Sequence, residues 1–210
     1  MTVVYFGSRE IYPDFYTAIR SLLAHNDAEV ITITEDADPF PDLPARNIEW
    51  HAEGFNDTNL KTKWKNFGVI RAAFPELLQE YDRVLSIDCD TIVNGDLTDL
   101  WNEDMTWHHV AMVRERTMTW EGRPYYNNGI CLMNLEKIRR DGVDDLMIRE
   151  LNTTFHRYVC QDVMQMFLSI KDLDPMWNQS KFTIASPTPK IFHYADRTDW
   201  RGLPEVERYR

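Results

Sequence analysis

Residues 81–101 read YDRVLSIDCDTIVNGDLTDLW, and this stretch decides the fold. Residues 83–87 (RVLSI) form a short apolar run that predicts a buried strand, and the run leads directly into Asp88-Cys89-Asp90. The end of such a strand is where α/β proteins open the crevice in which they bind ligands. Because side chains alternate along an extended chain, we expect Asp88 and Asp90 to project to one side and Cys89 to the other.

Two carboxylates at this separation suit a hard divalent cation, Mn²⁺ or Mg²⁺. The alternative interpretation is a solvated turn, since such triplets occur by chance in acidic chains. A second candidate ligand is His193, which ends the short apolar run Ile191-Phe192-His193. A histidine there is often structural, but its imidazole would complete a carboxylate-rich metal site. We therefore expect Asp88, Asp90 and His193 to converge.

The N-terminal segment predicts a strand, a helix and a second strand in succession. Residues 2–6 (TVVYF) and 29–34 (EVITIT) are β-branched and aromatic runs, and apolar residues recur at helical spacing over residues 12–25. Such a unit is typical of a parallel sheet covered by helices. The predicted fold class is α/β, with a mixed, mostly parallel central sheet flanked by helices.

The rest of the chain continues the same pattern. Residues 36–44 predict a loop, and residues 61–80 a helix with a boundary or kink near Pro75. Further predicted strands cover residues 110–113, 130–135, 182–185 and 191–193, and further helices cover 136–152 and 162–169. No repeat, low-complexity run or linker interrupts them, so residues 1–210 are predicted to form a single domain.

Composition excludes several functional classes. The chain has 210 residues, 43% of them hydrophobic and 27% charged, which is typical of a folded globular protein. Its net charge of −11 has the wrong sign for a general nucleic-acid binder, so no nucleic-acid partner is expected. The three cysteines lack the spacing of a disulfide framework or a zinc site. With no apparent signal peptide or transmembrane run, a cytoplasmic location is expected.

Tyr126-Asn127-Asn128-Gly129 is the third informative motif, and it precedes the apolar run ICLMNL. Asn-Asn-Gly is a turn signal, and glycine also lets the backbone approach a ligand closely. A tight turn into a strand and a ligand contact are equally good interpretations of the motif alone.

The sequence resembles glycosyltransferase family 8, which includes glycogenin and bacterial lipopolysaccharide galactosyltransferases. Residues 81–101 resemble its core of apolar strand, D-x-D, Gly-Asp-Leu and Leu-Trp. Further matches follow the family's order along nearly the whole chain. They are VVYFGS, RSLLAHN, Arg71 four residues before Pro75, YYNNGICLMNL, Gln161-Asp162, Trp177-Asn178 and IFHYADRTDW.

The resemblance implies a GT-A fold and a retaining hexosyltransferase that uses Mn²⁺ and a UDP-sugar, with an unidentified hydroxyl acceptor. It implies that Asp88 and Asp90 bind metal and diphosphate, and that His193 is the third protein ligand. It also implies a role in donor binding for the remaining matched positions, with Gln161 on the reacting face. These positions are Arg71, Cys89, Asn127, Asn128 and Gly129.

Chemistry and sheet geometry add further expectations. A developing oxocarbenium-like sugar needs a nearby carbonyl or carboxylate dipole, which Gln161 or Asp162 can supply. The nucleotide is expected across the carboxyl ends of the first and third strands, near Phe6, Gly7 and Ser8.

The chain departs from the family at several positions. Ser8 replaces an aspartate thought to read uracil, and Cys160 replaces the acidic residue before Gln161. The terminal motif has Asp196 where glycine is usual and lacks its lysine. Arg197 or Arg201 is a candidate for that missing cation, because guanidinium groups bind phosphate well.

These departures favour, as an alternative, a nucleotide-sugar-binding protein without catalysis. A nucleotidyltransferase is a weaker alternative. That class needs a Gly-rich basic loop after the first strand, and FGSRE matches such a loop poorly.

Overall fold

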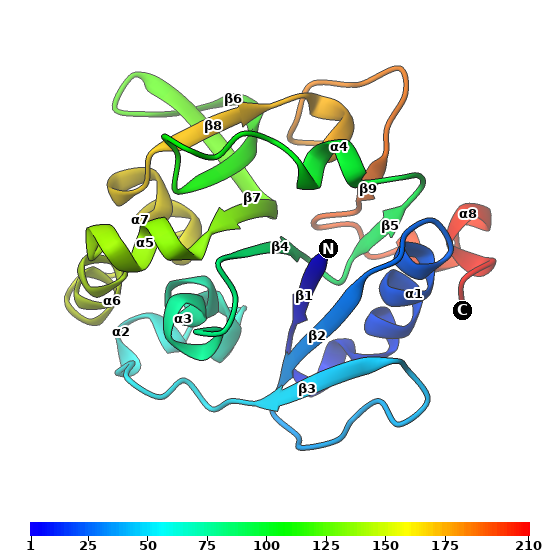
Figure 1. The fold of residues 1–210 in the computed structure, drawn as a ribbon, viewed down its shortest axis with the longest axis horizontal. Helices are drawn as coiled ribbons and strands as arrows, with labels where there is room; N and C mark the ends of the chain where they lie inside the picture. The colour runs from blue at the N-terminus through cyan, green and yellow to red at the C-terminus, as the bar shows by residue number, and fades with distance from the viewer.

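The computed structural model describes residues 1–210 (Figure 1). The strands are β1 (Thr2–Phe6), β2 (Glu29–Thr34), β3 (Ala45–Glu49), β4 (Arg83–Ile87), β5 (Thr91–Val93), β6 (Val110–Trp120), β7 (Arg123–Asn134), β8 (Ile170–Leu173) and β9 (Ile191–His193). The helices are α1 (Tyr12–Leu23), α2 (Asp57–Leu60), α3 (Ile70–Leu77), α4 (Thr98–Trp101), α5 (Leu135–Asp141), α6 (Val143–Thr153), α7 (Cys160–Phe167) and α8 (Pro204–Glu207). Short 3₁₀ turns form at Arg9–Ile11, Lys65–Gly68, Pro175–Trp177 and Trp200–Gly202.

Seven strands form the central sheet in the order β3-β2-β1-β4-β7-β6-β8. The first four run parallel, β7 is antiparallel to both β4 and β6, and β8 is parallel to β6. The predicted α/β class with a mostly parallel mixed sheet is confirmed. The predicted strands β1, β2 and β4 form at the expected residues, because their β-branched and apolar side chains are buried between two layers.

Helices cover both faces of this sheet, and each face has its own hydrophobic core. On one face, Phe15 and Ile19 of α1 pack with Leu85 of β4. On the other face, Phe74 of α3 and Met164 of α7 belong to a core that also includes residues of α5 and α6 (Figure 1). None of the helices combines the length and apolar character needed to cross a bilayer.

The segment containing Asn127, Asn128 and Gly129 lies inside strand β7, so the turn interpretation is wrong. The turn of the β6–β7 hairpin is at Glu121 and Gly122, whose φ angles of 49° and 77° suit a tight hairpin connection. The ladder between β6 and β7 shifts register on either side of the paired Val113–Asn127 and Arg114–Tyr126 positions. The Asn-Asn-Gly pattern therefore marks an irregular strand.

Other differences from the sequence prediction have local causes. The predicted helix over residues 61–80 is a 3₁₀ turn followed by α3, with Pro75 inside that short helix. The predicted helix over 136–152 is two helices, because Gly142 adopts a left-handed φ of 64° between them. Residues 182–185 form only an isolated bridge from Thr183 to Glu115.

Strand β9 pairs with β5 in a separate two-stranded antiparallel sheet. Thr91 is opposite His193 in this register, so the pairing brings His193 beside Asp90. The backbone N–H of Tyr194 donates to the carbonyl of Asp90 at 2.8 Å and fixes the same junction. A short strand late in the chain thus delivers a side chain to the end of β4.

Candidate metal and donor site

The backbone after β4 directs the two aspartates away from the core. The Asp88 N–H donates to the carbonyl of Gly129 at 2.8 Å, which extends the β4–β7 ladder by one residue. The Cys89 thiol is buried and donates to the carbonyl of Phe6 at 3.4 Å. The Asp88 and Asp90 side chains remain about one-third exposed, at 30% and 32%. The predicted alternation of these three side chains is confirmed.

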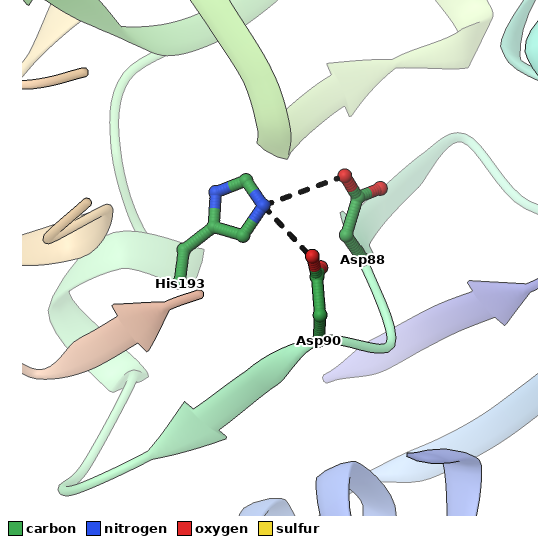
Figure 2. Close-up of side chains that lie close together, drawn as sticks. All are labelled: Asp88, Asp90 and His193. Carbon is green, nitrogen blue, oxygen red and sulfur yellow. Dashed lines mark ion pairs between the residues drawn. The ribbon is translucent and has the colours of Figure 1, made fainter. Parts of the chain in front are cut away.

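Asp88, Asp90 and His193 converge as the sequence predicted (Figure 2). One ligand atom from each lies within 4.8 Å of the others. The Nε2 of His193 is 3.4 Å from Asp90 Oδ1 and 3.7 Å from Asp88 Oδ2. The Nδ1 of His193 pairs with Asn178 Oδ1 at 3.0 Å, and a donor N–H at Nδ1 leaves the lone pair of Nε2 free for a cation. Two carboxylates and an oriented imidazole therefore fit a divalent metal ion.

The electrostatics of the three groups are mutually dependent. Burial lowers the pKa of His193, but the carboxylates of Asp90 and Asp88 outweigh burial and raise it overall. Burial raises the pKa of Asp90, but His193 outweighs that effect and lowers it overall. Burial dominates at Asp88 and raises its pKa despite the opposing charges of Arg71 and His193. A bound cation would take over the charge compensation that the protonated imidazole otherwise provides.

Arg71 lies beneath Asp88 and is almost fully buried. Its guanidinium donates to Asp88 Oδ1 at 2.7 Å and to the Ser86 hydroxyl at 3.1 Å, and it also lies over the Phe6 ring. A buried guanidinium paired in this way fixes the orientation of the carboxylate. Arg71 lines the adjoining cavity, as expected for a residue facing a donor sugar.

Two cavities meet at the aspartates, with volumes of about 280 Å³ and about 400 Å³. We call the first the inner cavity, because it reaches Glu115, Asn127, Gln161 and His193, and the second the outer cavity, because it reaches Ser8 and Asp14. The residues common to both are Phe6, Lys63, Trp64, Phe67, Asp88 and Asp90. The two cavities are therefore parts of one cleft with the carboxylates at their junction.

A buried polar network lines the inner cavity. Asn127 Nδ2 and Gln161 Nε2 both donate to Oε1 of Glu115, at 3.1 and 3.3 Å. The side-chain Oδ1 of Asn127 accepts from Asn178 Nδ2 at 2.9 Å, which links this network to His193. Both side-chain hydrogen bonds to the Glu115 carboxylate thus go to Oε1, which leaves Oε2 available to a ligand. Burial raises the pKa of Glu115, although Asn127 and Gln161 oppose the shift.

Glu115 was missed by the sequence prediction, because a single glutamate in a strand has no local motif. Residues 110–113 of β6 are all buried, so alternation along the strand does not single out Glu115 either. A carboxylate on the buried side of a strand needs partners, and here these partners come from β7 and α7.

Two predicted site residues do not face the cleft directly. The carboxylate of Asp162 accepts from the Tyr125 hydroxyl and from the backbone N–H of Tyr158, and the residue does not line either cavity. The expectation that Asp162 supplies a dipole to the sugar is therefore not supported. Gly129 also lies outside the cavity lining, and a side chain at this position would overlap the His193 ring. Asn128 does line the inner cavity, and its N–H donates to Gln161 Oε1 at 3.1 Å.

The outer cavity contains the residues expected near the nucleotide. Its lining includes Phe6, Gly7, Ser8 and the Cys89 segment, at the carboxyl ends of β1 and β4. It also includes Arg201, which forms a bidentate pair with the buried carboxylate of Asp14, both contacts being 2.6 Å. Arg197 lines the same cavity and pairs with Asp199. Both candidate arginines thus line the outer cavity, and each is paired with a carboxylate of the protein.

Gly129 provides the first test of the site. A methyl group on Gly129 would lie 2.1 Å from Cε1 of His193, so Gly129→Ala is expected to displace the imidazole. We expect the variant to lose stabilisation by Mn²⁺ in thermal unfolding. Gly202→Ala is the matched control, because a methyl there meets no atom within 4 Å. Unchanged Mn²⁺ stabilisation of Gly129→Ala would contradict this arrangement of the ligands.

Comparison of the fold with solved structures gives close matches. The galactosyltransferase LgtC, in complex with donor and acceptor sugar analogues, superposes with a TM-score of 0.80 at 18% identity, covering 100% of this chain and 94% of that one. An active-site mutant of LgtC gives 0.82 with the same coverage. GlyE of Streptococcus pneumoniae gives 0.74 at 20% identity, covering 99% of this chain and 58% of that one. The fold is therefore the GT-A fold.

Sequence comparison finds curated relatives that match part of the chain. A putative glycosyltransferase of Haemophilus influenzae is 28% identical over 107 residues, which is 45% of this chain and 32% of that protein. General stress protein A of Bacillus subtilis is 27% identical over 129 residues, which is 53% of this chain and 45% of that protein. The chain thus spans less than half the length of these relatives. The model of glycosyl transferase family 8 matches residues 43–196, and the chain belongs to that family.

Proposed function

We propose that this chain transfers a sugar from a nucleotide-sugar donor, a UDP-hexose, to a hydroxyl acceptor, with Mn²⁺ or Mg²⁺ bound by Asp88, Asp90 and His193. The observation that carries the proposal is the convergence of these ligands at the junction of two cavities. The inner cavity has the amides and the carboxylate that a sugar needs, and the outer cavity has arginines suited to phosphate. Membership of family 8 supports glycosyl transfer independently.

The protein's own residues prepare the site for a cation. Arg71 fixes the Asp88 carboxylate, and Asn178 fixes the His193 ring with Nε2 toward both aspartates. A bound divalent cation would neutralise the negative charge that develops on the departing diphosphate. Arg201 lies in the same cleft, and the N–H groups of its guanidinium that are not bonded to Asp14 would donate to the leaving group.

The inner cavity suggests how the proposed transfer proceeds with retention. For retention, the acceptor oxygen approaches from the face of the departing diphosphate, and it bonds to the anomeric carbon as the bond from that carbon to the diphosphate oxygen breaks on the same face. The bonding electron pair leaves with the nucleoside diphosphate, and the hydroxyl proton passes to Glu115. The raised pKa of Glu115 makes it a stronger base than an ordinary glutamate. Its free oxygen would also stabilise positive charge on the sugar.

A donor screen tests the proposal directly. We expect the cognate nucleotide-sugar with Mn²⁺ to raise the unfolding temperature by about 5–10 °C at concentrations about 100-fold above its dissociation constant. Without Mn²⁺ the rise is expected to be much smaller. Hydrolysis of the same donor in the absence of acceptor would show catalysis. No stabilisation by any nucleotide-sugar would refute the proposal.

The same screen tests base selectivity. Because Ser8 replaces an aspartate of the family pattern, we expect base selectivity to be looser than is typical of the family, so that GDP- and ADP-sugars also stabilise the protein. Strict preference for a single base would contradict this expectation.

Gln161 has a positioning role in this proposal. Its amide donates to Glu115 and its carbonyl accepts from Asn128, so Gln161→Ala frees the Glu115 carboxylate to move. We expect steady-state kinetics to show a larger fall in kcat than rise in KM, because the carboxylate acts mainly on transition-state charge. Gln165→Ala is the control one helical turn later, where the side chain contacts Tyr126 instead. Unaltered kcat in Gln161→Ala would exclude the role, and product NMR showing inversion would exclude retention.

A further inference from the structure

Three aromatic side chains border the inner cavity, and each has a cation over its ring. The pairs are Lys63 on Trp64, Arg157 on Tyr158 and Lys181 on Phe182, with cation-to-centroid distances of 4.6, 5.4 and 4.9 Å. All three aromatic residues line the inner cavity. We call the three cations together the cationic rim. Their segments are far apart in the sequence, so the fold alone gathers them.

The rim is continuous around one side of the cavity. The rings of Trp64 and Tyr158 lie 6.5 Å apart. Lys63 Nζ pairs with Asp196 Oδ1 at 3.0 Å, and Lys181 Nζ donates to the backbone carbonyl of Asp196 at 3.4 Å. Asp196 therefore joins the two lysines, although its φ of 57° is unusual for a residue other than glycine.

The positive charge of the rim is only partly compensated within the protein. Asp196 is the only carboxylate paired with any of its three cations, and neither Arg157 nor Lys181 forms a salt bridge. The chain as a whole carries a net charge of −11. Exposed ion pairs such as Lys63–Asp196 contribute little stability, so an anionic ligand can exchange with Asp196 at low cost. Lys63 lines the cleft, and Arg157 and Lys181 lie over rings that line the inner cavity, so the three cations border a site suited to an anion in an otherwise acidic protein.

The aromatic rings indicate that the ligand also has an apolar face. An exposed ring face packs well against the apolar face of a sugar ring, and Trp64 remains 40% exposed. Given the proposed transferase function, we propose that the acceptor is an anionic saccharide. Its sugar ring packs on Trp64 and Tyr158, and its phosphate or carboxylate group is bound by Lys181 and Arg157. The acceptor hydroxyl then shares the inner cavity with Glu115.

Matched sugars test this inference. Glucose 6-phosphate, glucuronate and glucose differ only in the group at carbon 6, so they separate a phosphate from a carboxylate and both from a neutral sugar. In calorimetric titration of the protein with Mn²⁺ and UDP, we expect at least one anionic sugar to bind about tenfold or more tightly than glucose. The advantage is expected to shrink as salt rises from about 0.05 to 0.5 M, because the rim is exposed. Equal affinities, no binding of the three sugars or a salt-independent preference would overturn the inference.

Single substitutions test which cations of the rim bind the anionic group of the sugar. Lys181→Gln and Arg157→Gln are each expected to reduce the ratio of anionic to neutral affinity by several-fold. Arg20→Gln is the matched control, because Arg20 also lies over an aromatic ring, at 5.4 Å from Tyr16, but that ring lines neither cavity, whereas Tyr158 and Phe182 line the inner one. An unchanged ratio in both rim variants would reject the assignment. Donor hydrolysis by the wild-type protein without acceptor tests the proposed transferase function separately.

Discussion

Replacing Asp90 by asparagine is expected to reduce the kcat/KM of the proposed transfer by roughly 10²–10³-fold. The substitution removes one of two carboxylates that face Nε2 of His193, at 3.4 Å for Asp90. A neutral amide binds Mn²⁺ or Mg²⁺ far more weakly than a carboxylate does. The variant should therefore lose Mn²⁺-dependent thermal stabilisation together with activity, as measured by calorimetry and donor hydrolysis.

Asp99→Asn is the matched control for this experiment, because Asp99 is exposed on α4 and lines neither cavity. It removes the same charge from the chain without changing the cleft, so its kcat/KM should match the wild type. An Asp90→Asn protein that keeps both Mn²⁺ binding and turnover would show that the three residues are not a metal site.

The second large effect is expected at Glu115. Glu115→Gln retains the size of the side chain and can still accept hydrogen bonds from Asn127 and Gln161. It removes the free carboxylate oxygen, so we expect kcat to fall by about 10²–10⁴-fold while donor affinity changes little. Glu76→Gln on α3 is a matched control, because Glu76 is exposed and lines neither cavity.

The pH profile distinguishes a base from a merely structural carboxylate. Burial raises the pKa of Glu115, and the ionised form is the one that accepts a proton. Activity should therefore rise with pH through that raised pKa and be lost on acidification at a higher pH than an ordinary glutamate would give. The residual activity of Glu115→Gln should lack this acid limb. A residual profile that keeps it would assign the titration to another group.

The sequence predicted the part of the fold that depends on continuous local patterns. β1, β2 and β4 are uninterrupted β-branched or apolar runs, and each is buried on both faces. Residues 45–49 (ARNIE) were missed, because an edge strand with polar side chains has no such run. The hairpin of β6 and β7 extended well beyond its apolar ends, since ladder hydrogen bonds continue where side-chain polarity gives no signal.

The candidate site likewise contains residues that a local sequence pattern predicts and residues that it does not. Asp88 and Asp90 were identifiable from their place at a strand end, and the convergence of His193 was expected from the run that precedes it. Glu115 was not identifiable, because its role depends on Asn127 and Gln161, which are 12 and 46 residues away. Gln161 was correctly expected at the cavity, but its amide is oriented by contacts between β6, β7 and α7 that no local pattern encodes.

The pairing of β9 with β5 has a consequence for biosynthesis. During translation the two aspartates leave the ribosome more than a hundred residues before the histidine that completes their ligand set. A nascent chain that has already assembled β1, β2 and β4 thus displays two carboxylates without an imidazole between them. Only when β9 docks does the cleft acquire its third candidate ligand, so a chain terminated before β9 would lack the proposed ligand set.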